Sequence, residues 1–94
     1  MALKISHSVR LKLANKKPPV TKEEILQCFA NNIGNILYDT RAEHVTDPLT
    51  RWFIAETDQA RKLKIMYIPL YPDITIKSAY DPNIEELRVY AKHG

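Results

Sequence analysis

Two segments near the N-terminus repeat apolar side chains every three or four residues, which is the spacing of one face of a helix. In residues 6–16, Val9 and Leu13 lie one turn apart, and two prolines follow at positions 18 and 19. Proline ends a helix because it donates no backbone N–H. Ahead of this helix, residues 3–5 alternate apolar and polar side chains, which permits a short edge strand.

The second helix has the clearest start signal in the sequence. Thr21 and Glu24 have the spacing of a capping box, in which the threonine hydroxyl and the glutamate carboxylate each accept a backbone N–H of the first turn. Ile25 and Phe29 follow one turn apart. These features predict a helix over residues 22–31.

From residue 36 the apolar period changes to two, the period of a strand. Strands are expected at residues 36–40, 51–57, 62–68 and 73–78, with a polar loop at residues 41–50. Asp81 followed by Pro82 is typical of a helix start, so a closing helix is expected after it. The pattern predicts a single α+β domain over residues 1–94. It has two N-terminal helices, an antiparallel meander of four or five strands, and a C-terminal helix.

The third expected strand separates its side chains by chemistry. Lys62 and Lys64 alternate with Leu63 and Ile65, so the lysines share one face and the apolar residues the other. One face is expected to pack beneath helices and the other to remain open, presenting Lys62, Lys64, Thr75 and Lys77. A basic open face can hold a phosphate backbone, although an ordinary solvated sheet face has the same pattern.

Composition narrows the possible chemistry. The 94 residues carry a net charge of +3, and residues 1–22 hold six basic side chains and no acidic one. A single cysteine, Cys28, excludes an internal disulfide and a multi-cysteine zinc site, and two glycines argue against a phosphate-binding loop. No cofactor or metal is expected. The chain has no apolar run of membrane-spanning length and no signal-like N-terminus, so a cytoplasmic protein is expected.

Basic and phenolic side chains can support cleavage of RNA, because attack by a 2′-hydroxyl needs a base, an acid and a cation but no cofactor. Arg51, Lys64 and Tyr80 are the candidate catalytic residues. The candidate substrate-binding residues are Arg41, His44, Lys62, Lys77 and Tyr90. Buried tyrosines with one hydrogen bond are the alternative interpretation of Tyr80 and Tyr90.

Three strand segments resemble the BrnT branch of the RelE-like type II toxins. They are residues 51–55, 63–67 and 76–79, with Glu86 and Tyr90 downstream. The resemblance implies a RelE/BrnT-like fold, a bacterial toxin–antitoxin system, RNA or the ribosome as target, and an antitoxin-like protein partner. Arg51 matches the arginine that begins a strand in that family. Tyr80 stands where the family pattern has an arginine after Ser-Ala, which removes a cation.

A second resemblance is to small bacterial proteins labelled ADP-ribosyl-(dinitrogen reductase) hydrolase. It rests on residues 39–44, 47–48, 52–57 and 79–80. The label implies a hydrolase that handles a sugar or nucleotide, with a pocket near Glu43, His44 and Asp47. The short chain and its few clustered carboxylates argue against a two-magnesium site.

Three functional hypotheses follow from the sequence. The first is a toxin-like domain that binds or cleaves RNA. The second is a non-catalytic protein-interaction module with a toxin-like fold, whose exposed apolar patch includes Trp52 or Tyr71. The third is the hydrolase that the label implies.

Overall fold

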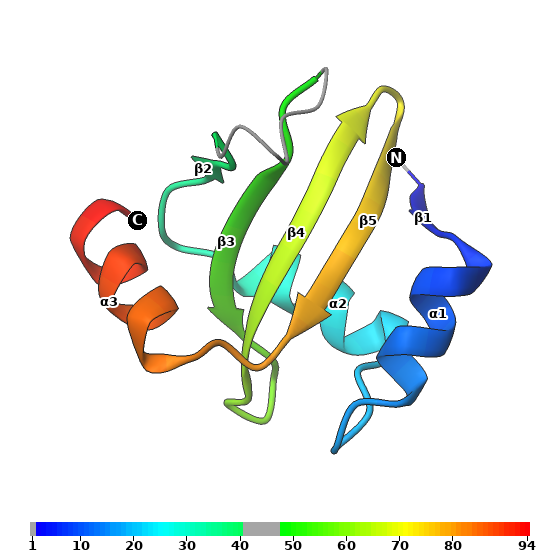
Figure 1. Cartoon of the computed structure of the whole chain (residues 1–94), viewed down its shortest axis with the longest axis horizontal. Coiled ribbons are helices and arrows are strands. Elements are labelled where there is room, and N and C mark those ends of the chain that lie inside the picture. The colour runs from blue at the N-terminus through cyan, green and yellow to red at the C-terminus, as the bar shows by residue number, and fades with distance from the viewer. Residues whose placement is uncertain (1, 41–47) are drawn as a thin grey trace.

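The computed structural model of the chain describes residues 2–40 and 48–94. Figure 1 shows the arrangement of its helices and strands. In chain order these are β1 (Leu3–Ile5), α1 (His7–Ala14), α2 (Lys22–Asn31), β2 (Leu37–Tyr38), β3 (Arg51–Glu56), β4 (Lys62–Leu70), β5 (Asp73–Tyr80) and α3 (Ile84–His93). The predicted α+β class is confirmed. None of the helices in the described ranges is both long and apolar enough to cross a membrane.

The strands of the described residues form one sheet in the order β1-β5-β4-β3-β2. Neighbours from β2 to β5 are antiparallel, as the meander predicts, whereas β1 lies parallel to β5. The sheet is therefore mixed, and the expectation of a purely antiparallel sheet is wrong at its edge. No hairpin constrains the direction of β1, because two helices and three strands separate it from β5 in the sequence.

The ends of several elements differ from the sequence prediction, and three of the differences bear on the site. The strand expected at residues 36–40 is only the two-residue β2, and β5 extends to Tyr80. The closing helix α3 has Asn83 as its N-cap, not Asp81. Asp81 instead accepts two hydrogen bonds from the Arg61 guanidinium, at 2.9 and 3.0 Å. The Asp81 carboxylate therefore forms a bidentate ion pair with Arg61 and does not cap the helix.

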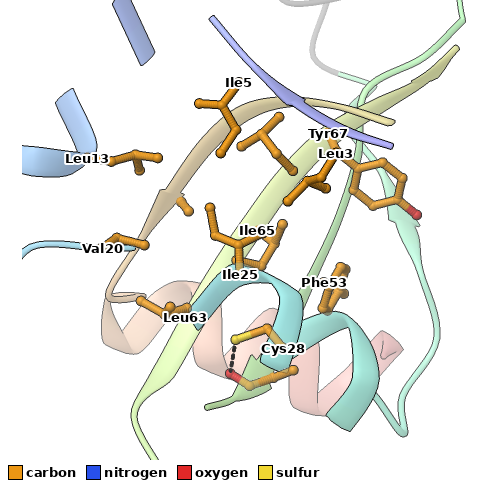
Figure 2. Close-up of a cluster of buried hydrophobic side chains, with 13 residues drawn as sticks. Leu3, Ile5, Leu13, Val20, Ile25, Cys28, Phe53, Leu63, Ile65 and Tyr67 are labelled. Carbon is orange, nitrogen blue, oxygen red and sulfur yellow. Dashed lines mark hydrogen bonds between the residues drawn. The ribbon is translucent and has the colours of Figure 1, made fainter. Parts of the chain in front are cut away.

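One face of the sheet packs against α2 and forms the core, shown in Figure 2. Phe53, Leu63 and Ile65 are fully buried there, beneath Ile25 and Cys28 of α2. The Phe29 ring of the same helix contacts the rings of Phe53 and Tyr67 edge-on, with centroids 4.9 and 5.2 Å apart. The predicted division of β4 into an apolar and a lysine-bearing face is confirmed here.

The opposite face of the sheet is not left open as expected, because α3 lies against it beside β3 (Figure 1). Contacts from Tyr90 to Trp52 and from Glu86 to Lys64 join this helix to the sheet. Lys64 is consequently buried, whereas Lys62 and Lys77 remain exposed. The prediction of an open face presenting Lys64 is wrong, since α3 supplies a carboxylate that lets the lysine leave water.

Candidate functional site

A cluster of three polar side chains lies between the sheet and α3. The Lys64 ammonium donates to Glu86 Oε2 at 2.7 Å, and the Tyr80 hydroxyl donates to the same oxygen at 2.5 Å. These three residues, called the Glu86 cluster below, come from β4, α3 and β5. The structure thus brings together two of the three candidate catalytic residues, Lys64 and Tyr80.

The positions of the cluster follow from strand register and helix capping. Lys64 and Tyr80 are paired directly across β4 and β5, so their side chains emerge side by side on the same face. Glu86 is the third residue of α3, where its Oε1 accepts the Asn83 backbone N–H at 3.0 Å. Asn83 Oδ1 in turn accepts the Glu86 N–H at 2.8 Å. One carboxylate oxygen therefore caps the helix, while the other accepts from Lys64 and Tyr80.

Glu86 is the functional candidate that residue chemistry alone did not select. The resemblance placed it downstream of the strands without a role. The spacing of Asn83 and Glu86 is a second capping box in this sequence, like that of Thr21 and Glu24. That signal marks the start of α3, but nothing in it shows that the free oxygen meets a lysine on a distant strand.

Aromatic rings and burial set the electrostatics of the cluster. The Lys64 Nζ lies 4.4 Å from the centroid of the Trp52 ring and 5.8 Å from that of Tyr80, within range of cation–π attraction. Burial of the Glu86 carboxyl raises its pKa, but the hydrogen bonds from Lys64 and Tyr80 more than offset this. The pKa of Glu86 therefore lies below its ordinary value, and the carboxylate is ionised at neutral pH.

The cluster borders a groove of about 500 Å³ between α3 and strands β2 to β4. Lys64 and Glu86 line this groove together with Trp52, Asn83 and Val89. Tyr80 reaches the shared carboxylate without lining it. A ligand in the groove would therefore be able to contact Lys64 and Glu86 but not Tyr80.

Arg51, the third candidate catalytic residue, lies on the other face of the sheet. It is paired with Tyr67 and alternates with Trp52, whose ring lies beside Lys64 on the α3 face. Because β3 is apolar on both faces, the sequence pattern did not decide which face Arg51 occupies. Its guanidinium lies 5.4 Å from the centroid of the Tyr38 ring and lines a separate pocket.

The candidate substrate-binding residues are dispersed. Lys62 begins β4, and Lys77 is left unpaired where the β4–β5 register shifts between Met66 and Tyr67. The Tyr90 hydroxyl donates to the Asn35 carbonyl at 2.9 Å, so this residue fastens α3 to the segment after α2. Burial raises the pKa of Tyr90. Arg41 and His44 lie outside the described residues, as do Glu43 and Asp47 of the expected hydrolase pocket.

Neither a metal site nor a reactive thiol emerges from the described ranges. Residues 2–40 and 48–94 contain no group of three or more His, Cys, Asp or Glu side chains that could hold a metal ion. Cys28 is buried, and burial raises its pKa to about 11. Its thiol therefore stays protonated at neutral pH and is a poor nucleophile.

Comparison with protein-family models, curated protein sequences and solved structures gives no match to this chain.

Proposed function

We propose that this protein binds RNA and cleaves it without a metal ion, at the groove lined by Lys64 and Glu86. The observation that carries the proposal is the shared Oε2 atom, which holds an ammonium and a phenol against one ionised carboxylate at the edge of a groove. Transesterification of RNA needs a base, an acid and a cation, and here the carboxylate is the base while the ammonium is both the cation and the acid. The predicted BrnT/RelE-like fold and cytoplasmic location belong to the same proposal.

Each residue has a distinct role in the reaction. Glu86 accepts the proton of a 2′-hydroxyl through Oε1, which has a second lone pair beyond its bond to the helix N-terminus. The 2′-oxygen then bonds to the adjacent phosphorus, and the bond to the 5′-oxygen breaks. Lys64, held 2.7 Å from Glu86 Oε2, stabilises the negative charge on the phosphoryl oxygens and protonates the leaving oxygen. Glu86 then releases its proton to water, and Lys64 takes one up from water. Tyr80 is a positioning residue, because it holds the carboxylate from outside the groove.

The proposed cleavage is tested with the full chain and a labelled RNA in the presence of EDTA. The products are expected to end in 2′,3′-cyclic phosphate. Glu86→Gln should lower the rate by about 10²- to 10⁴-fold, the usual contribution of a general base. Glu23→Gln is the matched control, since Glu23 is an exposed glutamate in the first turn of α2 and does not line the groove. Wild-type protein that leaves the RNA intact, or equal rates for the two variants, would contradict the proposal.

Tyr80→Phe gives an additional measurement that distinguishes positioning from simple packing. The Tyr80 hydrogen bond lowers the pKa of Glu86, so its removal raises that pKa. Because only the ionised carboxylate acts as a base, the acid side of the pH–rate profile should move to higher pH. A purely structural role for Tyr80 would lower the rate without moving the profile.

A second candidate is a non-catalytic module that binds an antitoxin-like partner. Tyr71, one of the two residues that this hypothesis offered, is 90% exposed and therefore available to a partner. Trp52, the other residue that this hypothesis offered, is buried at 9% exposure and is not available to a partner. Light scattering of the protein expressed with its gene neighbour would show a stable complex if this candidate holds.

A further inference from the structure

A separate pocket with a mostly apolar lining lies on the face of the sheet opposite the Glu86 cluster. It encloses about 250 Å³ beside the β4–β5 hairpin, and Arg51, Tyr67, Tyr71 and Asp73 are among the residues that line it. Nothing in the proposed cleavage chemistry uses these residues. The pocket therefore needs its own explanation.

Arg51 brings a guanidinium to this pocket. Its Nε is buried and has no hydrogen-bond partner among the described residues. Buried donors are nearly always paired, because an unpaired one has lost its water without compensation. Asp73, the carboxylate at the pocket, forms an ion pair with Lys4 at 3.1 Å. Because Nε is closed to solvent, an acceptor from outside the protein would meet the terminal N–H groups of the guanidinium, which lines the pocket.

Aromatic rings surround this donor. The Arg51 guanidinium lies over the Tyr38 ring, and Tyr71 at the mouth of the pocket leaves 90% of its surface exposed. Tyrosine rings on a surface are stacking platforms for unpaired bases, and a guanidinium is a preferred phosphate donor. Tyr38 also lines the groove of the Glu86 cluster, so it connects the two sites around the β2 edge.

The size of the pocket limits its ligand. About 250 Å³ is smaller than the roughly 300–1,000 Å³ of pockets that enclose a whole small molecule. A pocket of this volume can hold one monomer unit of a polymer whose other units lie outside it. We infer that this pocket binds one nucleotide of single-stranded RNA, with a phosphate oxygen accepting from the Arg51 guanidinium and the base stacked on Tyr71. This inference rests on the proposed function, since it assigns the part of the RNA that flanks the cleaved bond.

The probe for this pocket is a fluorescein-labelled 2′-O-methyl RNA of about ten nucleotides, a length within the usual range of single-strand sites. It lacks the nucleophilic hydroxyl, so binding is measured without cleavage. Tyr71→Ala should weaken binding by about 5- to 150-fold, which is the loss of one stacked base. Leu70→Ala is the matched control, because Leu70 is the neighbouring exposed residue without a ring.

Arg51→Met tests the phosphate contact through the salt dependence of binding. Loss of one phosphate contact should reduce the slope of log Kd against log salt by about 0.7 for a single strand. Arg88→Met is the control, since Arg88 lies exposed on α3 in its pair with Glu85. If Arg51→Met does not fold, as judged by thermal unfolding, the exposed Tyr71→Ala variant still decides the inference.

The possible outcomes separate this pocket from the cleavage site. Weaker binding by Tyr71→Ala supports the inference even if the wild-type protein cleaves nothing, in which case only the proposed cleavage fails. Tight binding by Tyr71→Ala, equal to that of Leu70→Ala, overturns the inference while cleavage at the Glu86 cluster stands. Absence of any RNA binding or cleavage by the wild-type protein overturns both.

Discussion

The two faces of the sheet hold their helices by different physical means. On one face α2 buries Ile25 and Cys28 completely and places Phe29 against two rings of the sheet. On the other face no residue of α3 is buried, and the helix is attached through Glu86, Tyr90 and their partners. The α2 face is an apolar core. On the α3 face, the contacts of Glu86 and Tyr90, called the polar joint below, attach the helix beside a groove.

This difference shows why the candidate chemistry lies beneath α3 and not beneath α2. Removing apolar area from water is nondirectional and leaves few polar groups near the surface. A helix attached through a carboxylate needs a cation and a hydroxyl opposite it, and such groups can also act on a ligand. Lys64 and Tyr80 meet that requirement at the edge of a groove. The Glu86 cluster is therefore both a part of the polar attachment of α3 and the candidate site.

Among variants that distinguish the two faces of the sheet, Phe53→Ala is expected to lower the free energy of unfolding most. Phe53 is fully buried and contacts the rings of Phe29 and Tyr67. Truncation of a buried phenylalanine costs about 3–5 kcal/mol, because the lost apolar contact leaves a cavity. Urea denaturation should show this loss, unchanged between low and high salt. A loss below about 1 kcal/mol would mean that the α2 face is not the main source of stability.

A smaller effect of a different kind is expected from Lys64→Met on the other face. Hydrogen bonds to charged groups contribute about 1.5–3 kcal/mol, so the free energy of unfolding at neutral pH should fall by about that amount. Methionine keeps much of the apolar stem of lysine, so the loss reports the ammonium. The measurement is again the free energy of unfolding in urea.

The pH dependence distinguishes this loss from a packing defect. The pKa of Glu86 lies below the ordinary 4.5 in the folded protein, so its ionised form stabilises the fold above about pH 4.5. That contribution is lost as the pH falls through the folded pKa. Lys64→Met removes a donor that lowers this pKa, so the variant and the wild-type protein should approach each other in stability toward acid pH. A constant difference at all pH values would contradict the polar joint.

The sequence was informative where one residue pattern had one structural solution. Alternation in β4 separated Lys64 from Leu63 and Ile65, and the Thr21 capping box located α2. It was uninformative where one pattern is compatible with two structures. Because β3 is apolar on both faces, the pattern did not decide on which face of the sheet Arg51 lies. The polar pattern on the α3 face of the sheet is the same whether that face contacts water or a helix with polar side chains. The pattern therefore did not predict that α3 covers it.

The β4–β5 register and the partner of Asp81 also lay beyond pattern reasoning. The shift between Met66 and Tyr67 leaves Lys77 unpaired, yet no glycine or proline marks that position. Asp81 forms its pair with Arg61, which is twenty residues away in the sequence. Long-range partners of this kind depend on which strands become neighbours in the sheet. The spacing of residues within one segment does not predict that order.

The smallest expected effect compares the two capping boxes, which are similar locally and differ in what lies beyond them. Thr21→Ala and Asn83→Ala each remove a side-chain acceptor from a helix N-terminus, at a cost of about 1 kcal/mol. The Thr21 cap lies away from the groove, so its loss should leave RNA cleavage unchanged. Asn83 lines the groove and its Oδ1 accepts the Glu86 N–H, so Asn83→Ala loosens the turn that carries the Glu86 carboxylate and should lower cleavage as well as stability. Equal cleavage by the two variants would show that the Glu86 carboxylate is held without its cap, and that Lys64 and Tyr80 alone fix its position.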